Sequence, residues 1–209
     1  MKIGVLALQG AFVEHISIMQ KLGVETSPIR LPNQLDNLDG LIIPGGESTV
    51  ILNLMQSFSL IHPIRELARA GLPILGTCAG MICLAKKVHD HDMGTLGVMD
   101  IVVKRNAFGT QIDSFETALP IPALGDKPFP AIFIRAPIIE SMDSEVDILA
   151  RLTNGTVVAA KQRKVIAVAF HPEFSDDLRF HRYFLDISSI PIERPEIGRS
   201  VSCSELKSL

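Results

Sequence analysis

The chain has 209 residues, of which 47% are hydrophobic and 21% are charged, so it fits one globular domain with enough apolar side chains to cover both faces of a central sheet. Its net charge of -3 comes from 20 basic and 23 acidic residues spread along the chain, which argues against a nucleic-acid or anionic-membrane partner. No apolar run approaches the roughly 18 residues that a membrane span needs. Three cysteines without framework spacing favour a reduced, cytoplasmic setting.

The first half of the chain alternates between short apolar runs and helical patterns. Residues 2–8 are almost continuously apolar, which is typical of a strand buried on both faces, and the polar residues that follow so soon disfavour a signal peptide. We expect strands at 2–8, 25–30, 40–43 and 73–75, and helices at 12–22, 49–58 and 63–70. A further apolar helix is expected after Gly76-Thr77-Cys78-Ala79-Gly80 and through Ala85. This alternation predicts an α/β domain with a mostly parallel sheet flanked by helices.

The second half is a run of short strand-like segments separated by Pro, Gly and Asn. We expect strands at 98–104, 114–119, 131–135, 147–152, 157–161 and 165–170. Such a run predicts antiparallel strands added to the sheet or flanking it. A last helix is expected at 176–187, and the Ser-rich polar tail 188–209 is expected to be weakly ordered, so residues 1–187 form one domain.

The most informative stretch is Gly76-Thr77-Cys78-Ala79-Gly80, which joins a short apolar strand to an apolar helix. It matches the nucleophile elbow, a strand–turn–helix pattern, with Cys in place of Ser. Glycines on both sides relieve crowding in a strained turn, and a helix N-terminus favours the reactive thiolate. A lone Cys at a strand end is more often a buried structural residue. The flanking glycines give the nucleophile interpretation about equal weight.

A second candidate element is Phe170-His171-Pro172-Glu173, which follows an apolar strand. A nucleophilic Cys needs a base, and the base needs an acceptor that orients it. His171 and Glu173 lie two residues apart, on one side of an extended chain. Taken alone, a surface His-Pro turn with a solvated Glu is the commoner interpretation.

The third element is the loop Pro44-Gly45-Gly46-Glu47-Ser48-Thr49, which lies between a strand and a helix. Glycines there let backbone N–H groups turn toward a ligand, and acyl transfer needs such donors where an oxyanion develops. The N–H groups of Gly46 and Ala79 are our candidates. A loop that merely turns is the alternative, whereas the GxGxxG and Walker patterns of phosphate loops are absent.

Together, the GTCAG elbow and the late His-Pro-Glu resemble class I, triad-type glutamine amidotransferases. Further stretches are similar to one branch of that family, the glutaminase subunits of pyridoxal 5′-phosphate synthase, and the likeness covers about residues 2–187. The stretches are Leu8-Gln9-Gly10-Ala11 with Glu14-His15, the Pro44–Thr49 loop, Lys104-Arg105-Asn106, Phe108-Gly109, Gln111, Ser114-Phe115-Glu116 and Ile134-Arg135-Ala136-Pro137. The sequence departs from the pattern at Ile138, where we expect a polar or aromatic residue.

The resemblance implies hydrolysis of L-glutamine to L-glutamate and ammonia by a Cys78–His171–Glu173 triad, without a cofactor or metal. The ammonia would pass, within a hetero-oligomeric complex, to a synthase subunit that builds pyridoxal 5′-phosphate from a pentose phosphate and a triose phosphate. Carried over by motif, the glutamine-binding residues would be Gly46, Glu47, Ser48, Arg105, Ile134 and Arg135, and Gln9 would face the synthase.

Several functional alternatives stay open from the sequence. The chain could serve another amidotransferase, in imidazole glycerol phosphate or aminobenzoate synthesis, or it could be a stand-alone cysteine hydrolase of γ-glutamyl peptides. A non-catalytic oxidant sensor or chaperone would use Cys78 but would not need His171 and Glu173.

Other reactive side chains are assigned ordinary roles. Cys83 is expected in the core and Cys203 is a bystander in the tail. A metal site at His89 and His91 is disfavoured against a solvated loop. His181 and Arg182, on the last helix, are expected at the surface.

Overall fold

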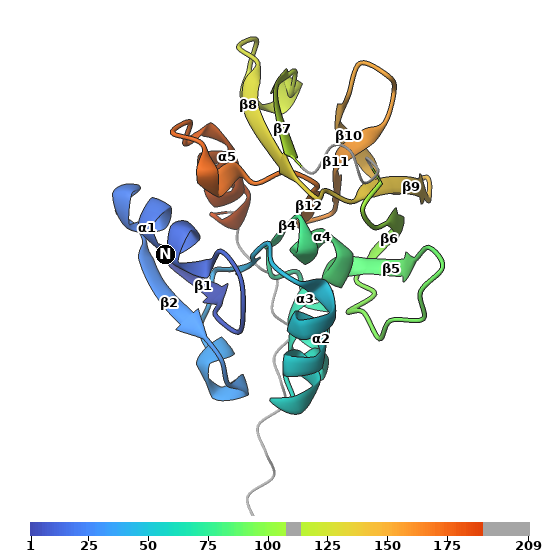
Figure 1. Ribbon diagram of the computed structural model, residues 1–209. Helices are drawn as coiled ribbons and strands as arrows, with labels where there is room; N and C mark the ends of the chain where they lie inside the picture. Colours follow the sequence, from blue (N-terminus) through green and yellow to red (C-terminus); the bar gives the residue numbers. More distant parts are fainter. Residues whose placement is uncertain (108–113, 190–209) are drawn as a thin grey trace, which may run out of the picture.

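The computed structural model describes residues 1–107 and 114–189. One ten-stranded sheet runs through the molecule in the order β2-β1-β3-β4-β12-β11-β9-β6-β5, with β10 paired to β11, and β7 and β8 form a separate antiparallel pair. The edge strands β2 and β5 lie on opposite sides of the molecule (Figure 1). In the described part of the chain, no helix is long and apolar enough to cross a membrane.

The strands occupy both halves of the chain. Their bounds are β1 Lys2–Leu6, β2 Glu25–Ile29, β3 Gly40–Ile43, β4 Ile74–Thr77, β5 Ala85–Val88, β6 Met99–Lys104, β7 Ser114–Leu119, β8 Phe129–Ile134, β9 Ile138–Met142, β10 Asp147–Arg151, β11 Val157–Gln162 and β12 Val165–Val168. The α-helices are α1 Phe12–Lys21, α2 Ser48–Ser57, α3 Ile61–Arg69, α4 Ala79–Leu84 and α5 Arg179–Ser188, and the 3-10 helices are η1 Pro32–Leu35, η2 Pro122–Leu124 and η3 Pro172–Phe174.

The direction of the strands confirms the predicted α/β class. Strands β2, β1, β3, β4 and β12 are parallel neighbours, whereas β12–β11, β11–β9 and β9–β6 are antiparallel. The carboxyl ends of β1, β3, β4 and β12 therefore meet at one edge of the sheet, where open α/β sheets bind their ligands. The loops after these four strands carry Gln9, the glycine loop, Cys78 and His171.

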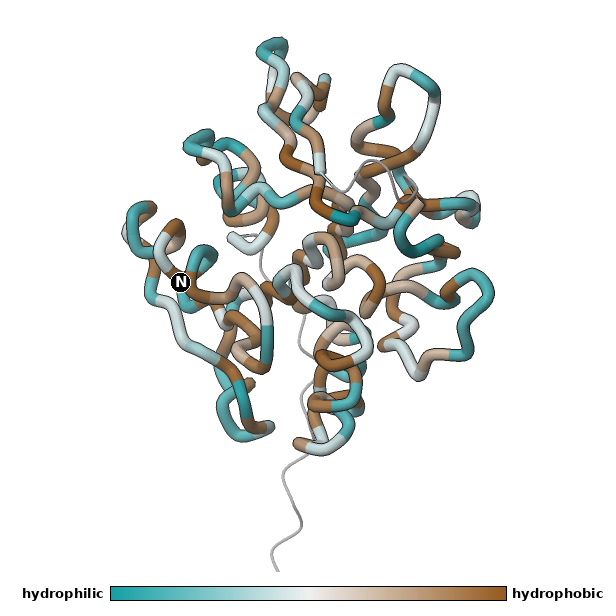
Figure 2. The backbone as a smooth tube through the Cα atoms, viewed as in Figure 1, coloured by the Kyte–Doolittle hydropathy of each residue, from teal (hydrophilic) through white to brown (hydrophobic). Residues whose placement is uncertain are grey.

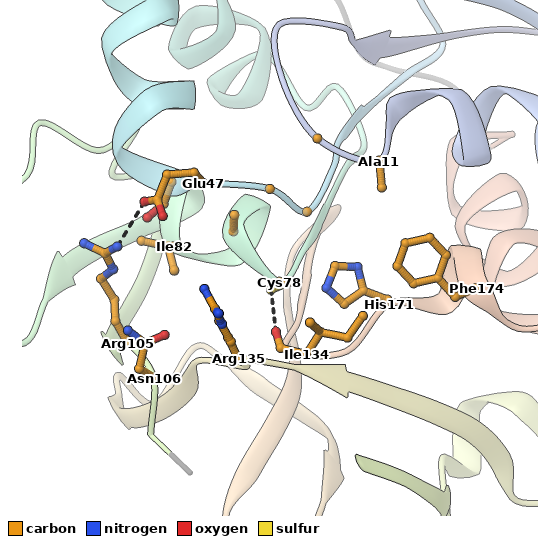
Figure 3. A pocket seen from close by; sticks show the side chains of 15 residues that line it. Ala11, Glu47, Cys78, Ile82, Arg105, Asn106, Ile134, Arg135, His171 and Phe174 are labelled. Carbon is orange, nitrogen blue, oxygen red and sulfur yellow. Dashed lines mark hydrogen bonds and ion pairs between the residues drawn. The ribbon is translucent and has the colours of Figure 1, made fainter. Parts of the chain in front are cut away.

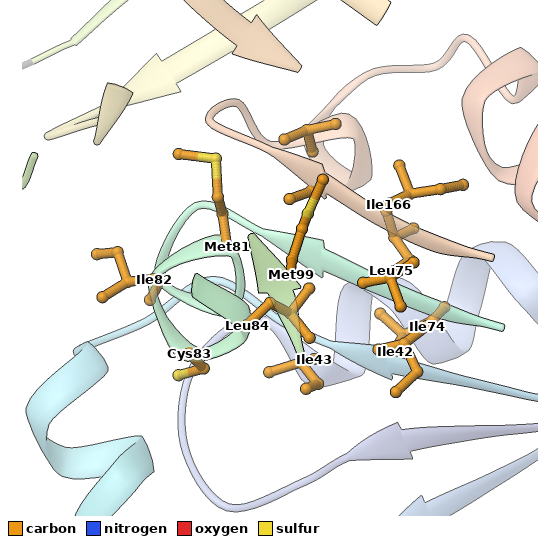
Figure 4. Packing of buried hydrophobic residues seen from close by; sticks show 14 of the residues in the cluster. Ile42, Ile43, Ile74, Leu75, Met81, Ile82, Cys83, Leu84, Met99 and Ile166 are labelled. Atoms are coloured by element: carbon orange, nitrogen blue, oxygen red, sulfur yellow. The ribbon is translucent and has the colours of Figure 1, made fainter. Parts of the chain in front are cut away.

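The core surrounds the central strands β3, β4 and β12, which are buried at every residue. Ile42, Ile43, Ile74 and Leu75 have no exposed surface, and the apolar helix α4, buried along its whole length, packs beside them (Figure 4). Each such side chain contributes about 1.5–3 kcal/mol of burial free energy. Figure 2 shows the same arrangement, with hydrophobic segments gathered inside and hydrophilic ones at the outer turns.

Two strands were missed by sequence reasoning. β5, Ala85–Val88, has only four residues, and its two adjacent central lysines are both exposed, so it shows neither an apolar run nor an alternation. β9, Ile138–Met142, mixes apolar and polar residues without a clear period and begins at Ile138. The last helix begins at Arg179 rather than at 176 and continues to Ser188, and residues 190–209 of the predicted tail lie outside the described residues.

Candidate active site

Cys78 lies in a strained turn between β4 and α4, as the elbow pattern predicts. Its backbone adopts φ +48° and ψ -103°, a conformation that costs a non-glycine residue about 1–3 kcal/mol. The Cys78 N–H donates to the Val168 carbonyl at 2.8 Å, which ties the turn to β12. A side chain at Gly76 would come within 2.7 Å of the Gly80 carbonyl, and one at Gly80 would overlap the Ile43 carbonyl oxygen. The two flanking glycines are therefore required by close packing.

His171 and Glu173 follow β12 and are both buried. The imidazole Nδ1 lies 2.7 Å from the Glu173 Oε1, which leaves Nε2 for Cys78. Phe174 stacks on the His171 ring, with ring centroids 5.1 Å apart and an interplanar angle of 21°. Burial alone would lower the pKa of His171, but hydrogen bonds to Cys78 and Glu173 and the charges of both outweigh it and raise the pKa to about 10. The imidazole is therefore held in its protonated form.

Glu173 is held as an anion in spite of its burial. Burial by itself would raise the pKa of this carboxyl group, but the interaction with His15 and the hydrogen bond and charge of His171 lower the pKa below its usual value. The His15 Nε2 lies 3.4 Å from the Glu173 Oε2. A permanent negative charge behind the imidazole fixes its tautomer and favours the imidazolium.

The glycine loop lies against both candidate catalytic side chains. A side chain at Gly45 would collide with the His171 ring and come within 3.4 Å of the Cys78 Cβ. The Gly45 N–H donates to the Thr77 Oγ1 at 3.0 Å, and the Gly45 carbonyl accepts from Ala11 N–H at 3.0 Å. Only a residue without a side chain fits at this position, so the loop can pass directly over the thiol.

Gln9 completes the loop's support. Its Oε1 accepts a hydrogen bond from the Glu47 N–H at 2.7 Å, and a side chain at Gly46 would collide with that same oxygen. Gly46 and Ala79, the two candidate oxyanion donors, both line the pocket, and Ala79 is the first residue of α4. The N–H groups of a helix's first turn have no acceptor within the helix, so the Ala79 N–H is available to a ligand.

A pocket of about 460 Å³ opens above Cys78 and is lined by every predicted glutamine-binding residue. Figure 3 shows His171 between Cys78 and Phe174, with Glu47 and Arg105 on the other side of the thiol. The Arg105 guanidinium donates to the Glu47 Oε1 at 3.1 Å. The pKa of Glu47 is lowered, first by the hydrogen bond from the Thr49 hydroxyl and further by Arg105. The pocket therefore holds a cation and an anion side by side, as an α-amino acid requires.

The rest of the predicted binding set also faces this pocket. Ser48 is 2% exposed, and its hydroxyl has no hydrogen-bond partner among the described residues. The Ile134 carbonyl accepts from the Cys78 thiol at 3.7 Å, and Arg135 beside it adopts φ +44°. A non-glycine residue in this left-handed region is uncommon and gathers at ligand sites.

One surface prediction was wrong. His181 is fully buried, and only Arg182 of that pair is exposed. The helix α5 packs that face inward, and the hydrophobic pattern of the helix could not reveal it because His is polar. Sequence reasoning also gave no role to Thr77, Phe174 or His15, all of which contact the site.

The other secondary predictions have simpler outcomes. Cys83 is buried in the core, as predicted, and burial raises the pKa of its thiol to about 12. His89 pairs with Glu140 and Asp90 at the surface. Within residues 1–107 and 114–189, no group of three His, Cys, Asp or Glu side chains could hold a metal ion. Phe108, Gly109, Gln111 and Cys203 lie outside the described residues.

The fold is that of class I glutamine amidotransferases. A crystal structure of a glutamine amidotransferase aligns over 90% of this chain and 99% of its own, with a TM-score of 0.85 and 42% identity. The structure of PurLQS from Thermotoga maritima shares the fold at a TM-score of 0.64 and 15% identity, over 88% of this chain and 97% of the matched chain.

The sequence comparison is more specific. The model of the SNO glutamine amidotransferase family matches residues 5–189, and the chain belongs to that family. Curated relatives include the pyridoxal 5′-phosphate synthase subunits PdxT of Dehalococcoides mccartyi and Herpetosiphon aurantiacus, each 54% identical over 190 residues. That alignment covers 90% of this chain and 97% and 100% of the two relatives.

Proposed function

We propose that this chain is the glutaminase subunit of a pyridoxal 5′-phosphate synthase, which hydrolyses L-glutamine to L-glutamate and ammonia at Cys78. The observation that carries the proposal is the convergence of three side chains on one pocket. Cys78 occupies a strained elbow, His171 lies beside it with a raised pKa, and Glu173 accepts from His171 at 2.7 Å. This is the arrangement that an activated thiolate nucleophile requires.

The substrate is bound by its α-amino acid end. Arg105 and Arg135, which line the pocket, receive the α-carboxylate in this proposal, and Glu47, which also lines it, receives the α-ammonium group. The Ser48 hydroxyl, which has no hydrogen-bond partner among the described residues, supplies a further polar contact. The side-chain amide then reaches toward the Cys78 sulfur between the glycine loop and the N-terminus of α4.

Acylation begins when the Cys78 thiolate attacks the carbonyl carbon of the substrate amide. The negative oxygen that forms is stabilised by the N–H groups of Gly46 and Ala79. His171 then gives its Nε2 proton to the amide nitrogen, the C–N bond breaks, and ammonia leaves with a γ-glutamyl thioester on the sulfur. Glu173 stays ionised throughout and stabilises the imidazolium form of His171.

Deacylation uses the same groups in the reverse sense. His171, now neutral, takes a proton from a water molecule as that water attacks the thioester carbonyl. The second tetrahedral oxyanion collapses, the carbon–sulfur bond breaks, and the γ-carboxylic acid that forms loses its proton to solvent as glutamate leaves. The sulfur departs as the thiolate and the imidazole keeps the proton taken from water, so both groups are ready for the next substrate. The steps need no cofactor.

The destination of the ammonia is inferred from the relatives. Curated proteins 54% identical to this chain are named as subunits of pyridoxal 5′-phosphate synthase, and their full length is covered almost completely. We therefore expect a cytoplasmic complex in which the Gln9 loop, which abuts the glycine loop, faces the synthase subunit that consumes ammonia together with a pentose and a triose phosphate.

Glutamate and ammonia release from L-glutamine tests the chemistry. The native chain should release both in equal amounts, and more rapidly once the synthase subunit is added. Cys78→Ala should abolish release, and Cys83→Ala, which changes a buried thiol away from the pocket, should not. Ammonia release by Cys78→Ala would refute the nucleophile. Ammonia release could instead be stimulated by a synthase that makes imidazole glycerol phosphate or aminobenzoate, and not by the synthase that makes pyridoxal 5′-phosphate. That result would refute the proposed pathway.

A further inference from the structure

Two buried histidines, His15 and His181, lie in a row behind the carboxylate of Glu173, on the side away from His171. His171 contacts the Glu173 Oε1 at 2.7 Å, and on the other side His15 Nε2 lies 3.4 Å from Oε2. The His15 Nδ1 in turn lies 3.1 Å from the Nε2 of His181. His15 and His181 have no exposed surface, and they come from helices α1 and α5, which are far apart in the sequence. Buried polar groups that are hydrogen-bonded to one another hold each other in fixed positions.

The protonation of His15 follows from its surroundings. Burial lowers the pKa of His15 in spite of the opposing effect of Glu173, and burial also lowers the pKa of His181 well below its usual value. Both rings are therefore neutral near pH 7, with one N–H each. An ionised carboxylate only accepts hydrogen bonds, so a lone pair of His15 facing Oε2 would be repelled. The proton of His15 belongs on Nε2.

The contact with His181 favours the same tautomer of His15, with the proton on Nε2. With Nε2 protonated, the His15 Nδ1 is an acceptor, so His181 must donate from its own Nε2 across the 3.1 Å contact. The His181 Nδ1, which has no hydrogen-bond partner among the described residues, is then an empty acceptor. The opposite assignment would let the Thr77 hydroxyl donate to the His15 Nε2. However, it would leave the buried His181 Nδ1–H without an acceptor and turn a lone pair of His15 toward the carboxylate, which is the costlier arrangement.

We propose that His15 is a positioning residue of the hydrolytic site: its Nε2–H holds the second oxygen of Glu173, and His181 fixes the tautomer that makes this possible. The inference deepens the proposed function and rests on it. In this structure the Glu173 Oε2 has no hydrogen-bond partner among the described residues, and the His15 Nε2 lies 3.4 Å from it. Catalytic contacts of this length commonly shorten when a substrate binds. His15 keeps Glu173 ionised and aimed at His171, and so acts on the reaction through two other side chains.

The same ring also reaches the glycine loop. The His15 Nε2 lies 3.3 Å from the Thr77 Oγ1, and that hydroxyl accepts from the Gly45 N–H at 3.0 Å. In this structure the contact of Nε2 with Thr77 is a hydrogen bond and the contact with Glu173 Oε2 is not, so the proposed donation to Glu173 needs a small shift of the ring. One buried side chain thus braces the triad carboxylate and, through Thr77, the loop that passes over the nucleophile.

Few charged or titratable groups lie near His15 and affect its protonation. The groups that act on the titration of His15 are Glu173 from η3, His171 from the end of β12, His181 from α5 and Glu14 from α1 itself. Glu14 is exposed and neighbours His15 only along the chain. Glu173 is the one buried carboxylate among them, so the effect of His15 on activity should appear in the ionisation of Glu173.

Matched substitutions at His15 test the proposal in the full chain, with the synthase subunit present. His15→Gln keeps an N–H near the Nε2 position, whereas His15→Leu has a similar size and no polar group. We expect His15→Gln to keep kcat within about threefold and His15→Leu to lose tenfold or more, with KM for glutamine little changed. Without the donor, the pKa of Glu173 rises, so the acid limb of kcat/KM should move to higher pH. His62→Leu, at an exposed histidine of α3, is the control.

A purely structural role predicts a different pattern. His15→Gln and His15→Leu would then lose activity by the same factor at every pH, and that result, or an unshifted acid limb in His15→Leu, overturns the proposal. If the native protein released no ammonia from glutamine, or if Cys78→Ala released as much as the native protein, the proposed hydrolysis itself would be refuted. If only the native protein is active, a failed prediction at His15 refutes the role of His15 alone.

Nitrogen NMR of the native chain decides the matter even if His15→Leu does not fold. Long-range proton–nitrogen couplings report which ring nitrogen carries the proton, and the His15→Gln spectrum assigns the His15 signals. We expect His15 and His181 to be neutral and protonated on Nε2 near pH 7 and above, because burial lowers the pKa of both rings. A proton on the Nδ1 of His15 would overturn the proposal.

Discussion

Replacing Glu173 by Gln removes one negative charge from the site while nearly preserving the shape of the side chain. The carboxylate is 6% exposed, its Oε1 accepts from His171 at 2.7 Å, and its Oε2 faces His15 at 3.4 Å. An amide can offer an oxygen to only one of the two rings. If its oxygen faces His171, its NH2 opposes the N–H of His15. If its NH2 faces His171, the imidazole takes the wrong tautomer and cannot act on Cys78.

The size of the effect follows from the hydrogen bond that is weakened. A hydrogen bond to a charged group is worth about 1.5–3 kcal/mol, and each 1.4 kcal/mol changes a rate about tenfold. We therefore expect Glu173→Gln to lower kcat by about 10- to 100-fold and to change KM little, because no glutamine-binding group is altered. Steady-state ammonia release, with the synthase subunit present, measures both constants.

The same variant changes stability in a pH-dependent way. The pKa of Glu173 is lowered in the folded protein, so its ionised form stabilises the fold above the unfolded value of about 4.5 and this contribution is lost as the pH falls through the folded pKa. In urea unfolding, the native chain should have a larger free energy of unfolding than Glu173→Gln at pH 7. This difference should disappear in acid. A kcat within threefold of the native value, or a variant more stable at pH 7, would refute the role of Glu173.

Three further outcomes are expected. Gly80→Ala, whose new side chain would overlap a carbonyl oxygen of β3, should lower the free energy of unfolding by about 1–3 kcal/mol and reduce activity, whereas Gly94→Ala, with open space around it, should be neutral in urea unfolding. Arg105→Ala should raise KM for glutamine about tenfold or more with a smaller effect on kcat, while Arg69→Ala, in an exposed ion pair, should leave both unchanged. Activity should fall as the pH rises through about 10, where His171 loses the proton that the departing ammonia needs, and a profile still rising there would contradict this.

The strands and turns that carry the candidate catalytic residues could be predicted because the sequence patterns that mark them are local. A buried strand that runs into a Gly-flanked Cys can hardly form anything but a tight turn, and Gly80 has no room for a side chain. The residues after β3, β4 and β12 meet because parallel strands end at one edge, a rule that needs only their order and type. His171 and Glu173 are close in the sequence, so their contact follows from local geometry.

The remaining features depend on packing between distant segments. His15 and His181 meet 166 residues apart, and no periodicity in α1 or α5 marks a polar ring as buried. β9 pairs with β6 and β11 through its backbone, so its mixed side chains carry little signal. The stacking of Phe174 on His171 depends on the short helix η3. The sequence analysis treated His-Pro-Glu as an extended chain, so it did not predict this helix.

The identity of the nucleophile is tested most directly by covalent labelling. A glutamine analogue that carries an electrophilic carbon in place of the side-chain amide should modify one thiol, and peptide mass spectrometry locates it. The adduct should appear on Cys78 and be prevented by excess L-glutamine, while Cys83, buried and with a pKa of about 12, stays unmodified. An adduct on Cys83 alone, or labelling that persists in Cys78→Ala, would contradict a reaction centred on the elbow.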